Sequence, residues 1–293
     1  MRFTFRTPFK TAVKRNIALN YLFSINKEHT QARGKKKLLT FANDYIGTFI
    51  AIDGLFEKIE LTCLIGYLRK NHPAIFTKMA IDIGANIGNH SIFFSKYFEN
   101  VIAYEAHPEI FEILSLNTKK IGNIEAKNIG LSDQAGTLKI ETDHLNMGAS
   151  KIKHELPSHD TEAVHLERGD KLLKDIKNIG LIKIDVEGME MKVLHGLKKT
   201  IDSNKPIVVF EQHIDDFEVG DVETPSITFL RDLGYEMITT TIEQNVGKNW
   251  VARRIYNLIS LAFGVKTTVE MLAVREVPSG SYSMIVAIHK SNC

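Results

Sequence analysis

The feature of the sequence that most constrains its fold is a regular alternation of short apolar strands and helical segments after residue 78. The stretches MAIDI, VIAYEA, LIKID and PIVVFEQ each have the apolar character of a buried strand, and stretches with helical spacing of apolar residues separate them. This alternation predicts a doubly wound α/β fold with a mostly parallel sheet and helices on both faces. The functional site of such a sheet lies at the carboxyl ends of its strands.

The chain divides by composition into three parts. Residues 1–37 carry ten Lys or Arg against a single acid, Glu28. We therefore expect a basic, helical N-terminal extension (1–45), a strand–helix lead-in (46–78) that begins with YIGTFIAI, and a main domain (79–293). A stretch of about 40 residues, at about 243–280, exceeds the usual length of a connection and predicts a cap-like insert.

Cysteine content and apolar runs indicate the compartment. Cys63 and Cys293 are the two cysteines, and no C-x-x-C spacing occurs, which fits a reducing cytoplasm. No uncharged apolar run reaches the roughly 18 residues that a membrane-spanning helix needs. The basic extension and the amphipathic stretch 250–264 either pack on the protein itself or make peripheral contact with the inner face of the membrane.

The stretch MAIDIGANIGNHSIFF (79–94) predicts a strand, a tight turn and a helix. Its spacing is Asp82-x-Gly84-x-x-x-Gly88, and Asn86 stands where a dinucleotide-binding turn has its middle glycine. No Lys or Arg lies between residues 79 and 95 to neutralise a diphosphate. The backbone N–H groups of the turn instead suit a single carboxylate, such as that of an amino-acid group.

Acidic residues at the ends of three strands complete the prediction of a ligand. Asp82 is suited to bind an ammonium group or to order the turn, and Glu105 is placed to accept hydrogen bonds from ribose hydroxyls. Asp185, the last residue of LIKID, and Glu187, two residues later, suit a positive sulfonium group. Carboxylate, ammonium, ribose and sulfonium together predict S-adenosylmethionine. The structural alternative is that the glycines only form a tight turn and Glu105 only caps a strand.

Several ordered stretches resemble the FkbM-type S-adenosylmethionine-dependent methyltransferases. The resemblance covers residues 47 to about 213 and rests on GLFEKIEL, IDIGANIGNHSIFF, VIAYEAHP, NIGLSDQAGTL, NMGAS, LIKIDVEGMEMKVLHGL and PIVVFEQH. It implies the class I methyltransferase fold, which is Rossmann-like and has seven strands with an antiparallel last strand. It also implies a methyl acceptor that is a hydroxyl of a sugar, glycan or secondary metabolite.

The same resemblance implies roles for individual residues. The methionine end of the donor would be lined by Gly84, Ala85, Asn86 and Gly88. Glu105 would bind the ribose, and Ser132 with Asp133 would bind the adenine. Members of the family often have His where this chain has Met189, so no role is carried to that position. The chain after residue 213 matches weakly, and we expect acceptor choice to lie there.

An alcohol must lose its proton when it is methylated, which requires a base. His213 is the leading candidate, because an imidazole with an ordinary pKa of about 6.5 accepts a proton near neutral pH. Asp185 and His90 are the alternatives, and Glu187 is placed beside the reacting centre. A Mg²⁺ ion held by Asp185 and Glu211 is a further alternative, but we assign no metal ligand.

Two other classes of function remain open at this point. One is an NAD-dependent oxidoreductase, which the glycine spacing disfavours, and the other is a catalytically silent module that keeps the fold for interactions. A nucleic-acid methyltransferase is not expected, because IDVEG stands where an Asn/Asp-Pro-Pro-aromatic element would be and the main domain is not basic. The sequence indicates no oligomeric state.

Overall fold

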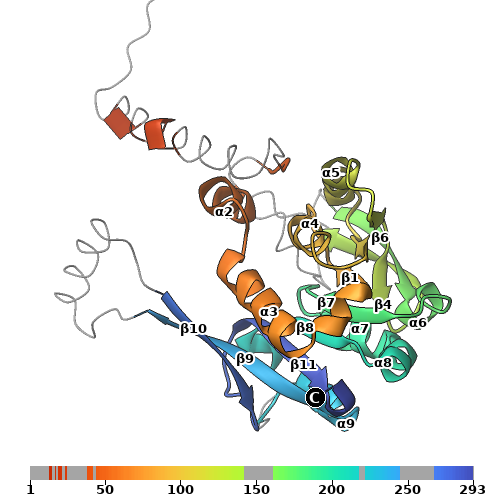
Figure 1. Cartoon of the computed structure of the whole chain (residues 1–293). Helices are drawn as coiled ribbons and strands as arrows, with labels where there is room; N and C mark the ends of the chain where they lie inside the picture. Colours follow the sequence, from red (N-terminus) through yellow and green to blue (C-terminus); the bar gives the residue numbers. More distant parts are fainter. Residues whose placement is uncertain are drawn as a thin grey trace, which may run out of the picture.

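The computed structural model describes residues 13–14, 17, 19–21, 24, 38–41, 44–141, 161–217, 222–244 and 267–292 (Figure 1). An eight-stranded sheet in the order β10-β9-β11-β8-β7-β1-β2-β3 forms the centre of this part of the chain. Its strands are β1 (Met79–Ile83), β2 (Asn100–Tyr104), β3 (Ile124–Lys127), β7 (Ile179–Ile184), β8 (Ile207–Gln212), β9 (Tyr235–Gln244), β10 (Thr267–Val274) and β11 (Tyr282–His289).

The strand directions confirm the predicted fold class. β3, β2, β1, β7 and β8 run parallel, while β11 is antiparallel to both of its neighbours, β8 and β9. The predicted number of seven strands is wrong by one, because β10 pairs with β9 and extends the sheet at its edge. β10 lies within the stretch predicted as a cap-like insert, so at least part of that stretch belongs to the sheet.

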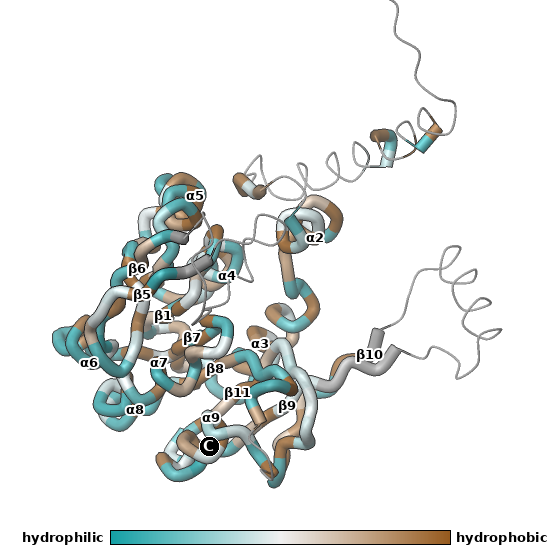
Figure 2. The backbone as a smooth tube through the Cα atoms, turned by 180° about the vertical axis from the view of Figure 1, so that it is seen from behind, coloured by the Kyte–Doolittle hydropathy of each residue, from teal (hydrophilic) through white to brown (hydrophobic). Residues whose placement is uncertain are grey.

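Helices cover both faces of the sheet. One face carries α3 (Lys58–Asn71), α4 (Asn89–Phe94) and α5 (Pro108–Thr118), and the other carries α6 (Gly169–Leu172), α7 (Glu190–Gly196), α8 (Lys198–Asn204) and α9 (Pro225–Asp232). Alternate strand residues point to opposite faces, so Ile81 and Ile83 pack with α7 and α9 while Ala80 packs with α3 and α4. The outer helices α6 and α8 are largely hydrophilic (Figure 2).

A smaller sheet of three strands adjoins the main one. It has the order β4-β6-β5, with β4 (Gly130–Ser132), β6 (Thr161–Arg168) and β5 (Gly136–Glu141). β4 is parallel and β5 antiparallel to β6. Short 3₁₀ turns follow α3 (η1, Pro73–Thr77), β8 (η3, Ile214–Asp216) and β11 (η4, Lys290–Asn292).

The lead-in was predicted to begin with a strand, and this is wrong. Residues 45–53 form α2 (Tyr45–Asp53), despite a composition rich in β-branched and aromatic residues. The Asp44 side chain accepts a hydrogen bond from the N–H of Gly47 and caps the helix, and Gly54, with φ 80°, ends it. Ile50 then packs against Ile87 and Ile110, which fixes the helix on the body of the protein.

Several predictions fall largely outside the described residues. In the N-terminal extension (1–45) the structure describes residues 38–41, 44 and 45 and seven earlier residues. These seven are all in helical conformation: Val13, Lys14, Ile17, Leu19, Asn20, Tyr21 and Ser24. The stretches 142–160 and 245–266, which include NMGAS and the amphipathic stretch 250–264, lie outside. Within the described ranges, no helix has both the length and the apolar character needed to cross a membrane. The membrane contact and the domain boundaries therefore stay predictions.

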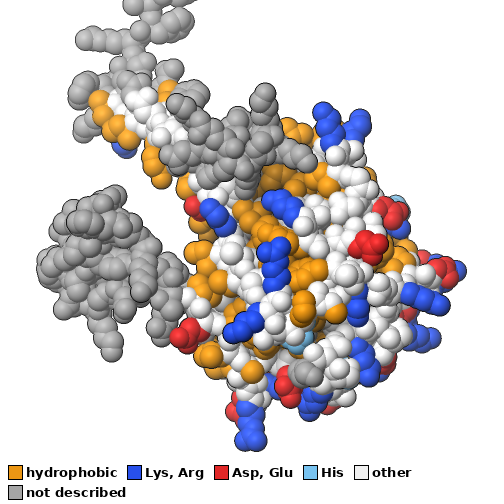
Figure 3. Space-filling model, in the orientation of Figure 1, with side chains coloured by type: hydrophobic (Ala, Val, Ile, Leu, Met, Phe, Trp, Pro, Cys, Tyr) orange, Lys and Arg blue, Asp and Glu red, His pale blue; other side chains and the backbone are white. Residues whose placement is uncertain are grey.

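The face seen in Figure 3 shows a band of hydrophobic side chains flanked by Lys and Arg. Hydrophobic side chains are exposed on two helices of this part of the molecule, namely Tyr45 and Phe49 on α2 and Ile59 on α3.

Candidate active site

A cavity of about 490 Å³ opens at the carboxyl ends of β1, β2, β7 and β8, the edge of the sheet at which a site was predicted. Its polar lining is acidic. Five carboxyl side chains line it, namely those of Glu57, Glu105, Asp185, Glu187 and Glu211. Among the described residues, no Lys or Arg side chain does so. The cavity therefore suits a ligand that is neutral or positively charged near this lining.

Strained backbone is concentrated around the cavity. Glu57, Asn86 and Glu187 have φ angles of 53°, 50° and 47°, in the left-handed region that residues other than glycine rarely adopt. They are three of the five such residues in the described part of the chain, and all three line the cavity. Strain of this kind collects at functional sites, where the surrounding structure fixes it.

The two glycines of the turn after β1 are required by the protein itself. Gly84 has φ 79°, and a Cβ added there would lie 1.7 Å from the carbonyl oxygen of Asp185 on the neighbouring strand. Gly88 has φ 92°, and its Cβ would lie 2.8 Å from Leu114 Cδ1 of α5. Gly84 and Ala85 line the cavity, but Gly88 does not. Gly88 instead allows α4 to pack closely on α5.

The backbone N–H groups of this turn are already bonded within the protein. Those of Gly84 and Ala85 donate to the carbonyl oxygen of Tyr104, and that of Gly88 donates to the carbonyl oxygen of Ala85. Those of Asn86 and Ile87 donate to side-chain oxygens, Glu105 Oε2 and Asn86 Oδ1. The prediction that these N–H groups hold the carboxylate of a ligand is therefore wrong for residues 84–88.

Glu105 lies at the cavity with its carboxylate held in place. It is 8% exposed, and it accepts hydrogen bonds from the N–H of Asn86 (2.9 Å) and of His107 (2.8 Å). Burial raises the pKa of Glu105 to about 7, against the lowering effect of hydrogen bonds from the N–H groups of His107, Asn86 and Ala106. The remaining lone pairs of the two oxygens are available to accept hydrogen bonds from a pair of hydroxyl groups.

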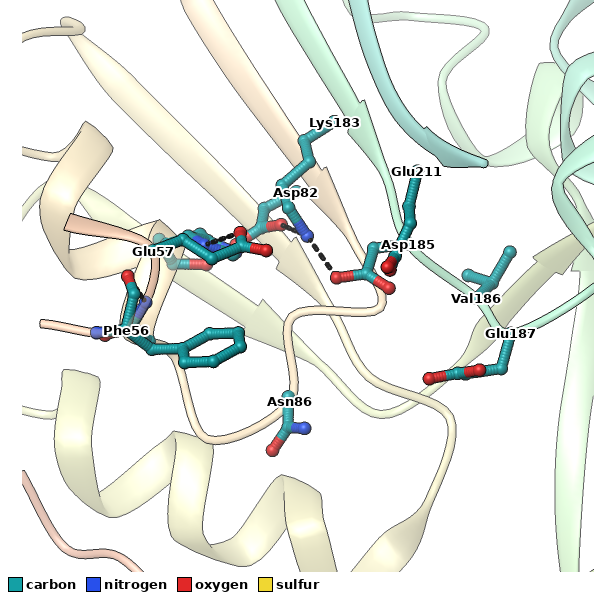
Figure 4. Close-up of polar contacts among 12 residues, drawn as sticks. Phe56, Glu57, Asp82, Asn86, Lys183, Asp185, Val186, Glu187 and Glu211 are labelled. Atoms are coloured by element: carbon teal, nitrogen blue, oxygen red, sulfur yellow. Dashed lines mark hydrogen bonds and ion pairs between the residues drawn. The ribbon is translucent and has the colours of Figure 1, made fainter. Parts of the chain in front are cut away.

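A buried lysine that the sequence analysis did not identify lies beneath the cavity. Lys183 Nζ lies 2.8 Å from Asp185 Oδ2 and 3.9 Å from Asp82 Oδ1 (Figure 4). Burial acts to lower the pKa of Lys183, but Asp185 and Asp82 outweigh it and hold that pKa above its ordinary value. The other oxygen of Asp82 accepts a hydrogen bond from Ser91 Oγ (2.5 Å). Asp82 is fully buried and does not line the cavity, so it orders the turn and is not placed to bind an ammonium group.

Asp185 and Glu211 form a hydrogen-bonded pair between two strands. Burial, followed by the charge of Asp185, raises the pKa of Glu211 to about 9. Burial also acts to raise the pKa of Asp185, but Lys183 outweighs it and holds that pKa below its usual range. At neutral pH Glu211 therefore carries a proton and donates a hydrogen bond to the Asp185 carboxylate. The alternative mechanism places a Mg²⁺ ion between Asp185 and Glu211, whereas in the structure these two side chains are hydrogen-bonded to each other.

The predicted base, His213, follows β8 and lines the cavity. His213 Nε2 lies 3.5 Å from Glu211 Oε1 and 4.0 Å from Glu187 Oε2, and the side chain is 42% exposed. The N–H of His213 donates to Asp216 Oδ2 (2.6 Å), which fixes the backbone at the start of η3. The alternative base His90 is instead buried in α4, with Nε2 3.0 Å from Glu57 Oε2.

The residues predicted to bind adenine lie away from the cavity. Ser132 is buried, and its carbonyl oxygen would lie 2.0 Å from a Cβ at Gly196 of α7. Neither Ser132 nor Asp133 lines the cavity, because the end of β4 packs against α7. The preceding residues Gly130 and Leu131 line it instead, beside the apolar side chains of Val164 and Leu166.

Two further observations bear on the predicted site. The lead-in contributes Tyr45, Ile46, Phe56 and Glu57 to the lining, which the sequence analysis had not assigned to the site. The sequence signal for this contribution was the stretch GLFEKIEL, which contains Phe56 and Glu57 and is one of the stretches that resemble the family. Within the described ranges, no group of three or more His, Cys, Asp or Glu side chains has the arrangement of a metal site.

Comparison with known proteins places the chain in a family. A model of the "Methyltransferase FkbM domain" matches residues 82–237, which is more than half of the chain. The hexuronic acid methyltransferase AglP of Haloferax volcanii is 28% identical over 131 residues, which cover 44% of this chain and 53% of AglP. The methyltransferase sdnD of Sordaria araneosa is 24% identical over 193 residues, covering 54% of this chain and 73% of sdnD. The match to AglP thus spans about half the length of that relative.

Among solved structures, the methyltransferase FkbM from Methylobacillus flagellatus is similar with a TM-score of 0.33 and 19% identity, over 46% of this chain and 32% of that one. The family model itself covers the turn after β1, Glu105, the end of β7 and His213. The chain belongs to the FkbM methyltransferase family.

Proposed function

We propose that this chain transfers the methyl group of S-adenosylmethionine to a hydroxyl group of a sugar, a glycan or a secondary metabolite. The observation that carries the proposal is the cavity at the carboxyl ends of the central strands, whose lining includes five carboxyl groups and, among the described residues, no Lys or Arg. S-adenosylmethionine supplies an electrophilic methyl group on a positively charged sulfonium. An acidic lining favours such a donor and disfavours a diphosphate, which argues against NAD.

The residues present fit this donor. The oriented carboxylate of Glu105 is suited to the two ribose hydroxyls, and the apolar side chains of Leu131, Val164 and Leu166 form a surface suited to a base. Asn86 accepts a bond from Ile87 at Oδ1, which leaves its Nδ2 as a donor for the donor's carboxylate. Asp185, ionised by Lys183, provides negative charge at the end of β7.

A second cavity adjoins the first and is suited to the methyl acceptor. This cavity, of about 540 Å³, shares Leu138, Glu187, Met189 and His213 with the first one. His213 therefore lies where the two cavities meet. In the proposed reaction its imidazole accepts the hydroxyl proton, and the carboxylate of Glu187, 4.0 Å from Nε2, stabilises the imidazolium.

A thermal-shift comparison tests donor binding. We expect S-adenosylhomocysteine to raise the melting temperature and NAD to leave it unchanged, because a ligand stabilises the folded state that binds it. The reverse result would support the oxidoreductase. The transfer itself is tested by incubating the protein with methyl-labelled S-adenosylmethionine and fractionated cell-envelope glycans. Binding of S-adenosylhomocysteine without label in any fraction or in a panel of hydroxylated metabolites would support a silent module.

A further inference from the structure

Three consecutive polar residues at the start of α4 connect separate parts of the chain. Asn89, His90 and Ser91 are 5%, 7% and 0% exposed. Ser91 bonds Asp82 in β1, as described above. Asn89 exchanges two hydrogen bonds of 3.1 Å with the backbone of Phe56, and His90 lies 3.0 Å from Glu57. The first turn of α4 thus holds the lead-in against the turn that follows β1.

Glu57 is held in an uncommon conformation by these contacts. It has φ 53° and ψ 39°, in the left-handed region, and it precedes the first residue of α3 without capping that helix through its side chain. This conformation is unfavourable for a residue with a Cβ. The hydrogen bonds of Asn89 to the preceding residue are positioned to maintain it. The result is a carboxylate at the cavity, with its side chain 14% exposed.

The environment of Glu57 distinguishes it from the other carboxyl groups of the site. Asp185 is bound by Lys183, and Glu105 is held by two N–H groups on the side of β2. Glu187 and Glu211 lie beside His213. In the view of Figure 4 they are on the other side of Asp185 from Glu57. Only Oε2 of Glu57 contacts His90, and no hydrogen bond to Oε1 occurs among the described residues. Oε1 is therefore available to a ligand.

We infer that Glu57 binds the ammonium group of the methionyl part of S-adenosylmethionine, with His90 and Asn89 as positioning residues. This inference rests on the proposed function. The ammonium requires a carboxylate at the cavity, and Asp82, to which the sequence analysis gave this role, is buried away from it. Glu57 lies on the same side as α4 and the turn after β1, where the amide of Asn86 is suited to the donor's carboxylate.

Calorimetric titration of three ligands tests the inference without measuring activity. The ligands are S-adenosylhomocysteine, its analogue without the amino group, and 5′-methylthioadenosine, which lacks the whole amino-acid part. We expect Glu57→Gln to weaken binding of S-adenosylhomocysteine about tenfold or more, the effect of losing a charge-assisted hydrogen bond. Binding of 5′-methylthioadenosine should change by less than about twofold. The matched control Glu112→Gln, on the exposed side of α5, should leave both affinities unchanged.

The wild-type protein provides a second, independent measurement. It should bind the analogue without the amino group about tenfold more weakly than S-adenosylhomocysteine, and Glu57→Gln should bind that analogue no more weakly than wild type does. Equal losses for S-adenosylhomocysteine and 5′-methylthioadenosine in the variant would show a structural role only and would overturn the inference. So would equal wild-type affinity for the first two ligands. If the wild-type protein binds none of the three, the proposed function itself fails, and the inference falls with it.

Discussion

Replacing Lys183 with Met should destabilise the protein in a way that depends on pH. The Lys183 side chain is 5% exposed, and its ammonium is 2.8 Å from Asp185 and 3.9 Å from Asp82. Met has a similar length and fills the space, so the main effect is the loss of the charge. Asp82, with 0% exposure, then keeps only its hydrogen bond from Ser91. Asp185 is less affected, because its side chain is 31% exposed and solvent offsets part of the loss.

The expected size of the effect follows from two estimates. Removing one partner of a buried ion pair costs about 3–5 kcal/mol. Alternatively, the uncompensated carboxylate takes up a proton, which for an aspartate with an ordinary pKa of about 3.9 costs about 5 kcal/mol at pH 7.5 and about 1.5 kcal/mol at pH 5. This cost is absent below the ordinary pKa of an aspartate and grows as the pH rises. We expect a loss of about 4 kcal/mol at pH 7.5 that shrinks to about 1.5 kcal/mol at pH 5.

Urea unfolding followed by circular dichroism at both pH values measures these free energies. Lys177→Met, at an exposed position before β7, is the control and should stay within about 0.5 kcal/mol of wild type. Adding Asp82→Asn to Lys183→Met should restore part of the stability at pH 7.5, because the uncompensated charge is gone. An equal loss at both pH values, or no recovery in the double variant, would show that packing and not charge explains the effect.

Three further predictions concern the cavity. Affinity for S-adenosylhomocysteine should fall as the pH is lowered from 8 to 6, because Glu105, with a pKa of about 7, becomes protonated. Calorimetry on Glu105→Gln should show weaker binding that no longer depends on pH in this range. Gly84→Val should lower the melting temperature or prevent folding, since its Cβ meets the Asp185 carbonyl; a variant with normal melting that only fails to bind would contradict this. His213→Asn should lower kcat by about 10²-fold or more with donor affinity within twofold, and the exposed His165→Asn should leave kcat unchanged; a fall in donor affinity alone would argue against a base.

The sequence allowed the central part of the fold and one side of the site to be predicted. Every residue of β7 is buried, and its apolar run, followed by Asp185 and Glu187, correctly indicated a central strand that ends at the site. Glu105 and His213 were placed at the cavity by the same reasoning, because parallel strands bring their carboxyl ends together. These predictions depend only on strand direction and order.

The remainder depends on contacts between distant residues, which local patterns do not contain. Gly84 has the spacing of a ligand-binding glycine, but the atom that excludes a side chain is the carbonyl of Asp185, about 100 residues later in the chain. Two N–H groups of its turn, those of Gly84 and Ala85, donate to the carbonyl oxygen of Tyr104 in β2, which only the pairing of β1 with β2 reveals. Lys183 could have been noticed as the one charged residue within IGLIKI, since a buried lysine requires acidic partners. Glu57 offered no comparable signal, because its role depends on a left-handed backbone.

Strand β10 lies at the edge of the main sheet, where changes in length are least disruptive to the rest of the fold. β10 and β9 form a hairpin at one end of the sheet, and β11 separates this hairpin from β8, the nearest strand that contributes to the cavity. The family model ends at residue 237, within β9, so β10 lies beyond the shared part of the chain. An insertion or deletion between Gln244 and Thr267 changes the length of a hairpin connection and leaves the register of β1, β2, β7 and β8 intact. Changes in this hairpin can therefore accumulate without altering the strands that form the cavity.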